Sequence, residues 1–142
     1  MLSARAEFDA PDLARAIADA QPDATIVDVN SWGATAAAEA WGGPWATFSP
    51  YPLAITSRDA PPFGPGLPPA RGPLGRLRDR ALRPLIVGSY ERAVLPPLNG
   101  VRRELGPPAL ESTDDFFARP PLVLYLTAEP FEYRARTGRR AS

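Results

Sequence analysis

Residues 26–50 read IVDVNSWGATAAAEAWGGPWATFSP, and this stretch decides the fold class. Its first strand is ATIVDV (24–29), a short and nearly continuous apolar run of the kind found in strands covered on both faces. Asn30 and Ser31 can then cap an alanine-rich helix over about residues 32–41. The stretch therefore begins as a buried strand that leads directly into a helix.

The same stretch continues into a second strand. Gly42-Gly43-Pro44 ends the helix, and WATFS (45–49) predicts another buried strand. Strand, helix and strand at such short intervals predict a right-handed crossover and a parallel sheet. We expect an α/β fold with a partial Rossmann-like parallel sheet of about three strands, flanking helices and a long proline-rich loop.

The segments on either side of this unit supply the expected loop and an early helix. A helix is predicted over residues 11–20, with Asp9 as its N-cap and Pro11 in its first turn. The eight prolines from Pro50 to Pro73 are too many for a helix or a central strand. This region is therefore predicted to be a long loop, and loops of that length are commonly functional or disordered.

The C-terminal half returns to helical spacing and ends in a third strand. A helix is expected over residues 74–95, where Pro84 should kink or divide it. A further helix is expected within 96–110, where Gly106-Pro107-Pro108 stops it. A further helical turn covers 114–118, and PLVLYLT (121–127) predicts a third buried strand. We expect residues 1–133 to form one partial domain and residues 134–142 to be a disordered tail.

Composition excludes several kinds of chemistry. The 142 residues include no histidine and no cysteine, so a Ser-His-Asp triad, a thiol nucleophile and the usual zinc ligands are absent, and we expect no metal site. The net charge is zero and the arginine-rich helix lacks interleaved aromatic residues, which argues against nucleic acid as a partner. No apolar run reaches about 20 residues, so no membrane span is expected, and the location is predicted to be cytoplasmic.

Candidate site residues gather where the strands end. Asp28 closes the first strand, and ligands bind outside the carboxyl ends of strands in open α/β sheets. The alternatives for Asp28 are a cap for the following helix and a solvated loop carboxylate. Aromatic groups beside it can line a pocket for a flat, apolar molecule, although they serve equally well as core. The candidates for binding such an acceptor are Trp32, Ser49, Tyr51, Phe63 and Leu67.

Four segments in order resemble one family. The opening stretch resembles part of the N-terminal domain of GT-B glycosyltransferases of the UDP-glycosyltransferase type, closest to bacterial members that glycosylate macrolides and other natural products. SRDAPPFGPGLPPARGPLGRLRDRALRPL (57–85) is similar to their acceptor-side loop and helices. LNGVRRELGPPAL (98–110) and PLVLYLTAEPFEY (121–133) resemble the elements that close that half. No single segment is diagnostic, but the four follow the family's order.

The resemblance implies inverting, metal-independent transfer of a hexose from a nucleotide-sugar to a hydroxyl of a small hydrophobic acceptor. Asp28 matches the aspartate that orients a general-base histidine in that family, and this chain contains no histidine. The family holds its nucleotide-sugar in a second domain, after the part that the resemblance covers. The chain is therefore expected to be a fragment that holds no cofactor and is inactive alone.

Two other interpretations stay open at the level of sequence. One is a non-catalytic binding or auxiliary module, which would associate with itself or with a full-length transferase because an incomplete sheet leaves strand edges and apolar faces open. The other is a non-functional remnant of a longer gene.

Overall fold

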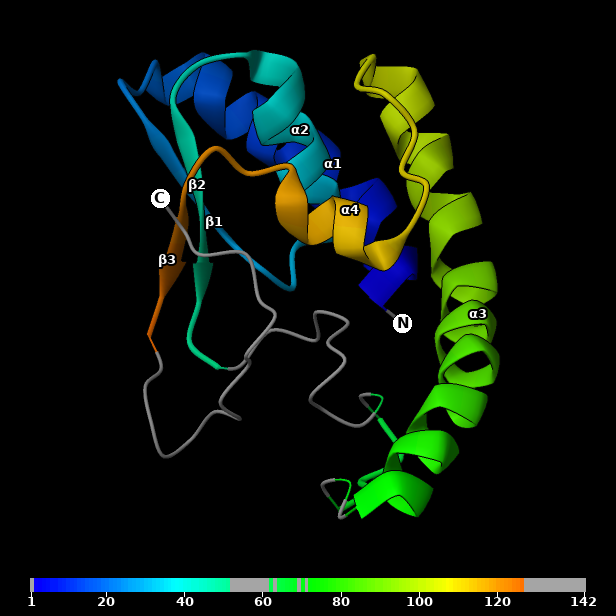
Figure 1. Ribbon diagram of the computed structural model, residues 1–142. Coiled ribbons are helices and arrows are strands. Elements are labelled where there is room, and N and C mark those ends of the chain that lie inside the picture. The colour runs from blue at the N-terminus through cyan, green and yellow to red at the C-terminus, as the bar shows by residue number, and fades with distance from the viewer. Residues whose placement is uncertain (1, 52–61, 63, 69, 71, 127–142) are drawn as a thin grey trace.

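In the part of the chain that the structure describes, three parallel strands form one sheet (Figure 1). The computed structural model describes residues 2–51, 62, 64–68, 70 and 72–126. The strands are β1 (Thr25–Asp28), β2 (Trp45–Ser49) and β3 (Val123–Tyr125), in the order β1-β2-β3. The predicted α/β class and three-stranded parallel sheet are thus confirmed. Most of the proline-rich loop and the predicted tail lie outside the described residues.

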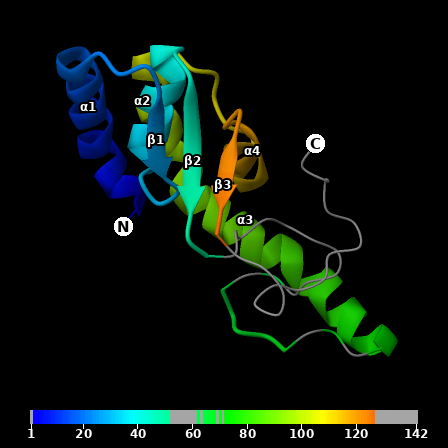
Figure 2. The ribbon, with the colours of Figure 1, turned by 90° about the vertical axis from the view of Figure 1, so that its left-hand side faces the viewer.

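Four helices flank the sheet in the described part of the chain. They are α1 (Leu2–Ala20), α2 (Trp32–Trp41), α3 (Gly72–Leu105) and α4 (Thr113–Ala118). The helix α2 packs against β1 and β2, and both α1 and α3 pack against α2. The first half of α3 extends away from the sheet (Figure 2). None of these helices combines the length and the hydrophobicity needed to cross a membrane.

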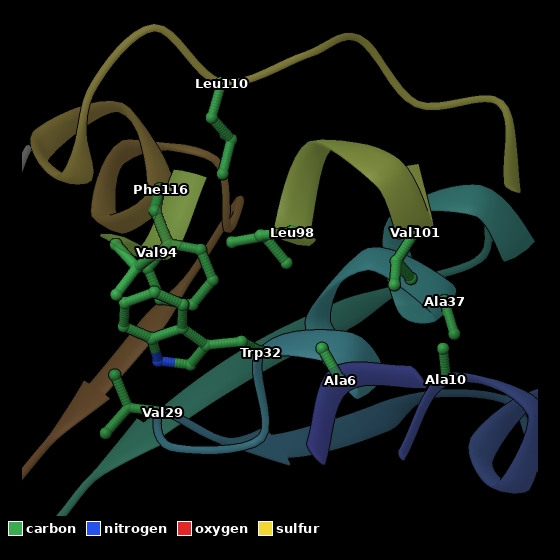
Figure 3. Packing of buried hydrophobic residues seen from close by; sticks show 10 residues of the cluster. All are labelled: Ala6, Ala10, Val29, Trp32, Ala37, Val94, Leu98, Val101, Leu110 and Phe116. Carbon is green, nitrogen blue, oxygen red and sulfur yellow. The ribbon is translucent and has the colours of Figure 1, made fainter. Parts of the chain in front are cut away.

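The main core lies between α1, α2, α3 and the segment that leads into α4. At its centre Trp32 lies beside Phe116 and Val94 (Figure 3). The members of this cluster are Ala6, Ala10, Val29, Trp32, Ala37, Val94, Leu98, Val101, Leu110 and Phe116. A smaller cluster between the sheet and α2 contains Val27, Ala34, Ala38 and Trp45. The alanine-rich composition of α2 therefore serves close packing between helices and sheet.

The prediction that the first strand is covered on both faces is wrong. Val27 points into the cluster beneath α2, whereas the neighbouring Ile26 is 64% exposed. Successive side chains of a strand point to opposite faces, so Ile26 lies on the face that the helices leave open. One face of β1 is packed and the other contacts solvent.

The predicted start of the first helix is also wrong. The helix α1 begins at Leu2, so Asp9 is not its N-cap and Pro11 lies in its interior. Ala6 and Ala10, which precede Pro11, are buried in the main core. Their burial supports the helical turns before the proline, whose missing N–H would otherwise favour a break.

The two helices predicted over 74–95 and within 96–110 are one helix, α3, which contains Pro84, Pro96 and Pro97 and ends at Leu105, at the predicted stop before Gly106. Val94, Leu98 and Val101 lie on both sides of the Pro96-Pro97 pair, and all three are buried in the main core. Their spacing of four and three residues places them on one helical face. The same core interface therefore continues across the two prolines and offsets the lost backbone hydrogen bonds.

The last helix is one residue longer than the predicted 114–118, and the last strand is shorter than predicted. The helix α4 begins at Thr113, after an N-cap at Ser112 whose hydroxyl accepts a hydrogen bond from the Asp115 N–H (3.0 Å). The third strand spans Val123–Tyr125, within the predicted 121–127. The prediction that it is buried is wrong, because Val123 and Leu124 are only partly buried and Tyr125 is 38% exposed.

Candidate functional site

Asp28 ends β1 with an exposed carboxylate that is held by its neighbour Asn30. The Asp28 Oδ1 atom accepts hydrogen bonds from the Asn30 backbone N–H (2.8 Å) and from Asn30 Nδ2 (2.9 Å). The N-cap of α2 is Ser31, and no side chain caps that helix. Asp28 is therefore not a helix cap, and its carboxylate has a defined orientation at the carboxyl end of the sheet.

A chain of hydrogen bonds connects the ends of β1 and β2. The Tyr51 hydroxyl donates to Asn30 Oδ1, and the Asn30 amide donates to Asp28. The fully buried Ser49 donates from Oγ to the Tyr51 carbonyl oxygen (2.8 Å). The structure thus brings Asp28, Ser49 and Tyr51 together. It also adds Asn30, which the sequence presented only as a helix cap.

Trp32 belongs to the core and not to an open pocket. Its side chain is only 4% exposed, and its ring centroid lies 4.9 Å from that of Phe116. On another side the Tyr90 ring meets it edge to face, at 6.3 Å between centroids and 88° between planes. Trp32 therefore has little surface of its own to offer a ligand.

Tyr90 is a candidate site residue that sequence reasoning missed. It lies in the middle of α3, far from Asp28 in sequence, and it is 47% exposed beside Trp32. Partial burial raises the pKa of the Tyr90 phenol, and the nearby Tyr51 phenol raises it further. Two phenols from distant segments are therefore near enough to influence each other electrostatically. No local motif around residue 90 could have indicated this.

The two remaining predicted residues lie in the proline-rich segment. Phe63 lies outside the described residues. Leu67 precedes Pro68, whose carbonyl oxygen accepts a hydrogen bond from Arg78 Nη2 (2.8 Å). That contact ties the short stretch around Leu67 to the first turns of α3.

Two surface hollows lie away from Asp28. One, of about 470 Å³, opens between α1, α2 and the end of α3, and Ile17, Trp41 and Leu105 are among its mostly apolar lining. The other, of about 440 Å³, lies between α3 and Asp114. We place the candidate site at Asp28 because hydrogen-bonded polar side chains converge there at the carboxyl end of the sheet.

The described residues hold no cluster of three or more histidine, cysteine, aspartate or glutamate side chains able to bind a metal ion. The site is thus one carboxylate with a network of an amide, a serine hydroxyl and a phenol, beside a second phenol. Such groups can accept and donate hydrogen bonds to a hydroxylated ligand.

Comparison with known proteins gives one informative similarity. No family model matches the chain. The chain is 32% identical over 124 residues to the 4'-demethylrebeccamycin synthase of Lentzea aerocolonigenes. The matched region is 86% of this chain and 30% of that relative, so the chain spans less than a third of the relative's length. At this coarse level the similarity supports a glycosyltransferase-like fragment.

Proposed function

We propose that this chain is the acceptor-binding part of a glycosyltransferase. The complete enzyme would transfer a hexose from a nucleotide-sugar to a hydroxyl of a small hydrophobic acceptor, with inversion and without a metal. The observation that carries the proposal is the Asp28 carboxylate, exposed at the carboxyl end of a parallel strand and held there by two hydrogen bonds. The similarity to a synthase named for the product 4'-demethylrebeccamycin supports it.

In this proposal Asp28 orients a histidine that another part of the enzyme supplies, since the present chain has none. A carboxylate that accepts an imidazole N–H fixes the ring and stabilises its charged form, which favours proton removal from an acceptor hydroxyl. The half-exposed Tyr51 ring would contact the acceptor directly, and Phe63 and Leu67 would extend that surface. Buried Ser49 and Trp32 would support it from behind.

The same proposal predicts that the chain alone transfers no sugar. A general base commonly contributes about 10²–10⁴ in rate, and it would be missing. The nucleotide-sugar would be bound by a part of the enzyme outside this chain, so that donor and acceptor could not be positioned together here.

The test combines turnover with binding. Purified chain is incubated with UDP-glucose and a panel of hydroxylated aromatic aglycones, and aglycone binding is followed by quenching of tryptophan fluorescence. We expect no product, and we expect binding that Asp28→Asn and Tyr51→Ala weaken. Glu7→Gln, which changes an exposed carboxylate on α1, is the matched control. Product formation by the chain alone would contradict the fragment proposal, and binding indifferent to both site variants would contradict the acceptor site.

A second candidate, an auxiliary module that docks on a partner, is favoured by the open face of the sheet. This face carries Ile26 of β1 and Leu122, which precedes β3. Ile26 pairs with Ala46 of β2, and the Leu122 carbonyl oxygen accepts a hydrogen bond from the Thr47 N–H, so the two residues flank β2 on the same face. Both side chains are more than half exposed. Size-exclusion chromatography with light scattering, with and without a full-length homologous transferase, tests this candidate. A monodisperse monomer in both runs would contradict it.

A further inference from the structure

We propose that Asn30 is a positioning residue of this site, which acts on a ligand through Asp28 and not by touching the ligand itself. The inference rests on the proposed function, because it describes how the carboxylate of that site is prepared for a hydroxylated acceptor.

Hydrogen bonds from Asn30 converge on one oxygen of the Asp28 carboxylate. Both donors of Asn30, its backbone N–H at 2.8 Å and its Nδ2 at 2.9 Å, bond to Asp28 Oδ1. Within the described part of the chain, the hydrogen bonds of this carboxylate all end on Oδ1. An ionised carboxylate offers lone pairs on both oxygens. The second oxygen, Oδ2, is thus the one that a ligand hydroxyl or an imidazole N–H would meet.

The orientation of the Asn30 amide is itself fixed by its two neighbours. Its Oδ1 accepts from the Tyr51 hydroxyl while its Nδ2 donates to Asp28. A reversed amide would set its oxygen against the carboxylate oxygen, which is unfavourable because neither is a donor. Only a side chain with an acceptor and a donor on one planar group satisfies both neighbours. Aspartate at this position would place a second negative charge beside Asp28.

The hydrogen-bond network ends at Ser49, a buried residue of β2. Tyr51 is held through its carbonyl oxygen by the hydroxyl of Ser49, which is fully buried at the end of β2. Asn30 therefore couples the Asp28 carboxylate to the neighbouring strand as well as to its own loop. Such support keeps a binding group in its productive orientation before the ligand arrives.

If Asn30 served only to shape the local turn, its side chain would have no effect on ligand binding. One variant distinguishes this local role from the positioning role. The backbone N–H of residue 30 alone closes a turn on Asp28. Asn30→Ala keeps that turn but removes the side-chain bond to Asp28 and the link to Tyr51. If Asn30 only shapes the turn, the variant should leave ligand binding unchanged.

The experiment measures the affinity of the chain for quercetin, a planar polyphenol, and for its fully methylated ether, which has no hydroxyl donors. In the unmodified chain we expect quercetin to bind more tightly than the ether. In Asn30→Ala we expect quercetin binding to weaken by about tenfold while binding of the ether stays unchanged. Tyr51→Phe should also weaken quercetin binding, by less than Asn30→Ala does. Adding Asn30→Ala to Asp28→Asn should cause no further loss, because both act through one group.

Failure of this inference and failure of the proposed function are distinguishable. If the unmodified chain binds quercetin and Asn30→Ala keeps the preference over the ether, the inference is wrong and the proposed function stands. If the unmodified chain binds neither compound, the proposed function fails. In that case the side-chain amide NMR signals test whether Asn30 bonds to Asp28 and Tyr51. These signals are easily assigned, because the chain has two asparagines, Asn30 and Asn99. The Asn30 amide signals should shift in both Asp28→Asn and Tyr51→Phe, and unchanged signals would overturn the positioning role.

Discussion

Arg102 Nη2 lies 2.8 Å from Glu39 Oε2, and this ion pair joins α3 to α2 inside the protein. The Arg102 side chain is only 1% exposed, and its Nε donates to the Pro108 carbonyl oxygen (2.7 Å). Arg119 approaches the other Glu39 oxygen at 3.6 Å. Glu39 belongs to the opening stretch and Arg102 to LNGVRRELGPPAL, so two segments that carry the family resemblance meet directly. Their contact concerns stability and lies away from the Asp28 site.

Arg102→Ala should destabilise the fold strongly. The variant leaves the partly buried Glu39 without its main partner and the Pro108 carbonyl without a donor, and breaking a buried pair from one side typically costs about 3–5 kcal/mol. Because Glu39 is 20% exposed, we expect a value at the lower end, about 3 kcal/mol. The free energy of unfolding from urea denaturation, followed by circular dichroism, measures it.

The neighbouring exposed Arg103 provides the matched control, since Arg103→Ala removes the same side chain from the same helix turn without a buried partner. Its effect should stay within about 0.5 kcal/mol. Equal losses for the two variants would show that the ion pair contributes nothing specific.

Asn99→Ala should loosen the segment between α3 and α4. Asn99 Oδ1 accepts from the Leu110 N–H (2.8 Å), and its Nδ2 donates to the Leu110 carbonyl oxygen (3.0 Å). Removing both bonds leaves the backbone polar groups of a buried residue unpaired, at a cost of about 1–3 kcal/mol. Hydrogen exchange of the Leu110 amide should accelerate. Asn99→Asp keeps the acceptor for the Leu110 N–H, so its exchange should change less, and identical acceleration in both variants would contradict the pairing.

The main strands could be predicted from sequence because their signal is local. Residues 24–29 and 45–49 are short apolar runs on either side of a helix, and this alternation of strand, helix and strand favours a parallel sheet. Pro96 and Pro97 misled the helix prediction, because local chemistry favours a break and only burial of the flanking Val94 and Leu98 overrides it. Tertiary packing of this kind cannot be derived from spacing alone.

The site was predictable only in part, for a similar reason. Asp28 is a candidate from sequence alone, because ligands bind outside the carboxyl ends of parallel strands. Tyr90 and the role of Asn30 depend on contacts between segments distant in sequence, which no local pattern records. The sequence leaves Trp32 ambiguous, because an aromatic ring near the end of a strand can line a pocket or pack in the core. The structure places it in the core, with its side chain 4% exposed.

The raised pKa of Tyr90 predicts a loss of stability in alkali. Burial and the Tyr51 phenol favour the protonated form in the folded state, so the unfolded chain ionises first, at about pH 10. Between that pH and the higher pKa of the folded state, the unfolded chain binds fewer protons, and stability falls as pH rises. We expect Tyr90→Phe to reduce this fall. In Tyr51→Phe the pKa of Tyr90 should decrease, measured by NMR of the labelled phenol carbon, and an unchanged pKa would contradict the proximity of the two phenols.

Gly33→Ala should prevent α1 and α2 from packing. A Cβ atom at this helical position would lie 2.7 Å from the Ala6 Cα and closer still to the Ala6 carbonyl oxygen, and both are backbone atoms that cannot rotate away. Overpacking in a core typically costs about 1–3 kcal/mol, and this overlap with backbone should exceed that range. Gly100→Ala is the matched control, because it lies in α3 with no atom within 4 Å of its added Cβ and should stabilise the helix by about 0.5–1 kcal/mol. Thermal unfolding of the two variants should therefore shift in opposite directions, and a Gly33→Ala variant as stable as the unmodified chain would contradict the close approach of the two helices.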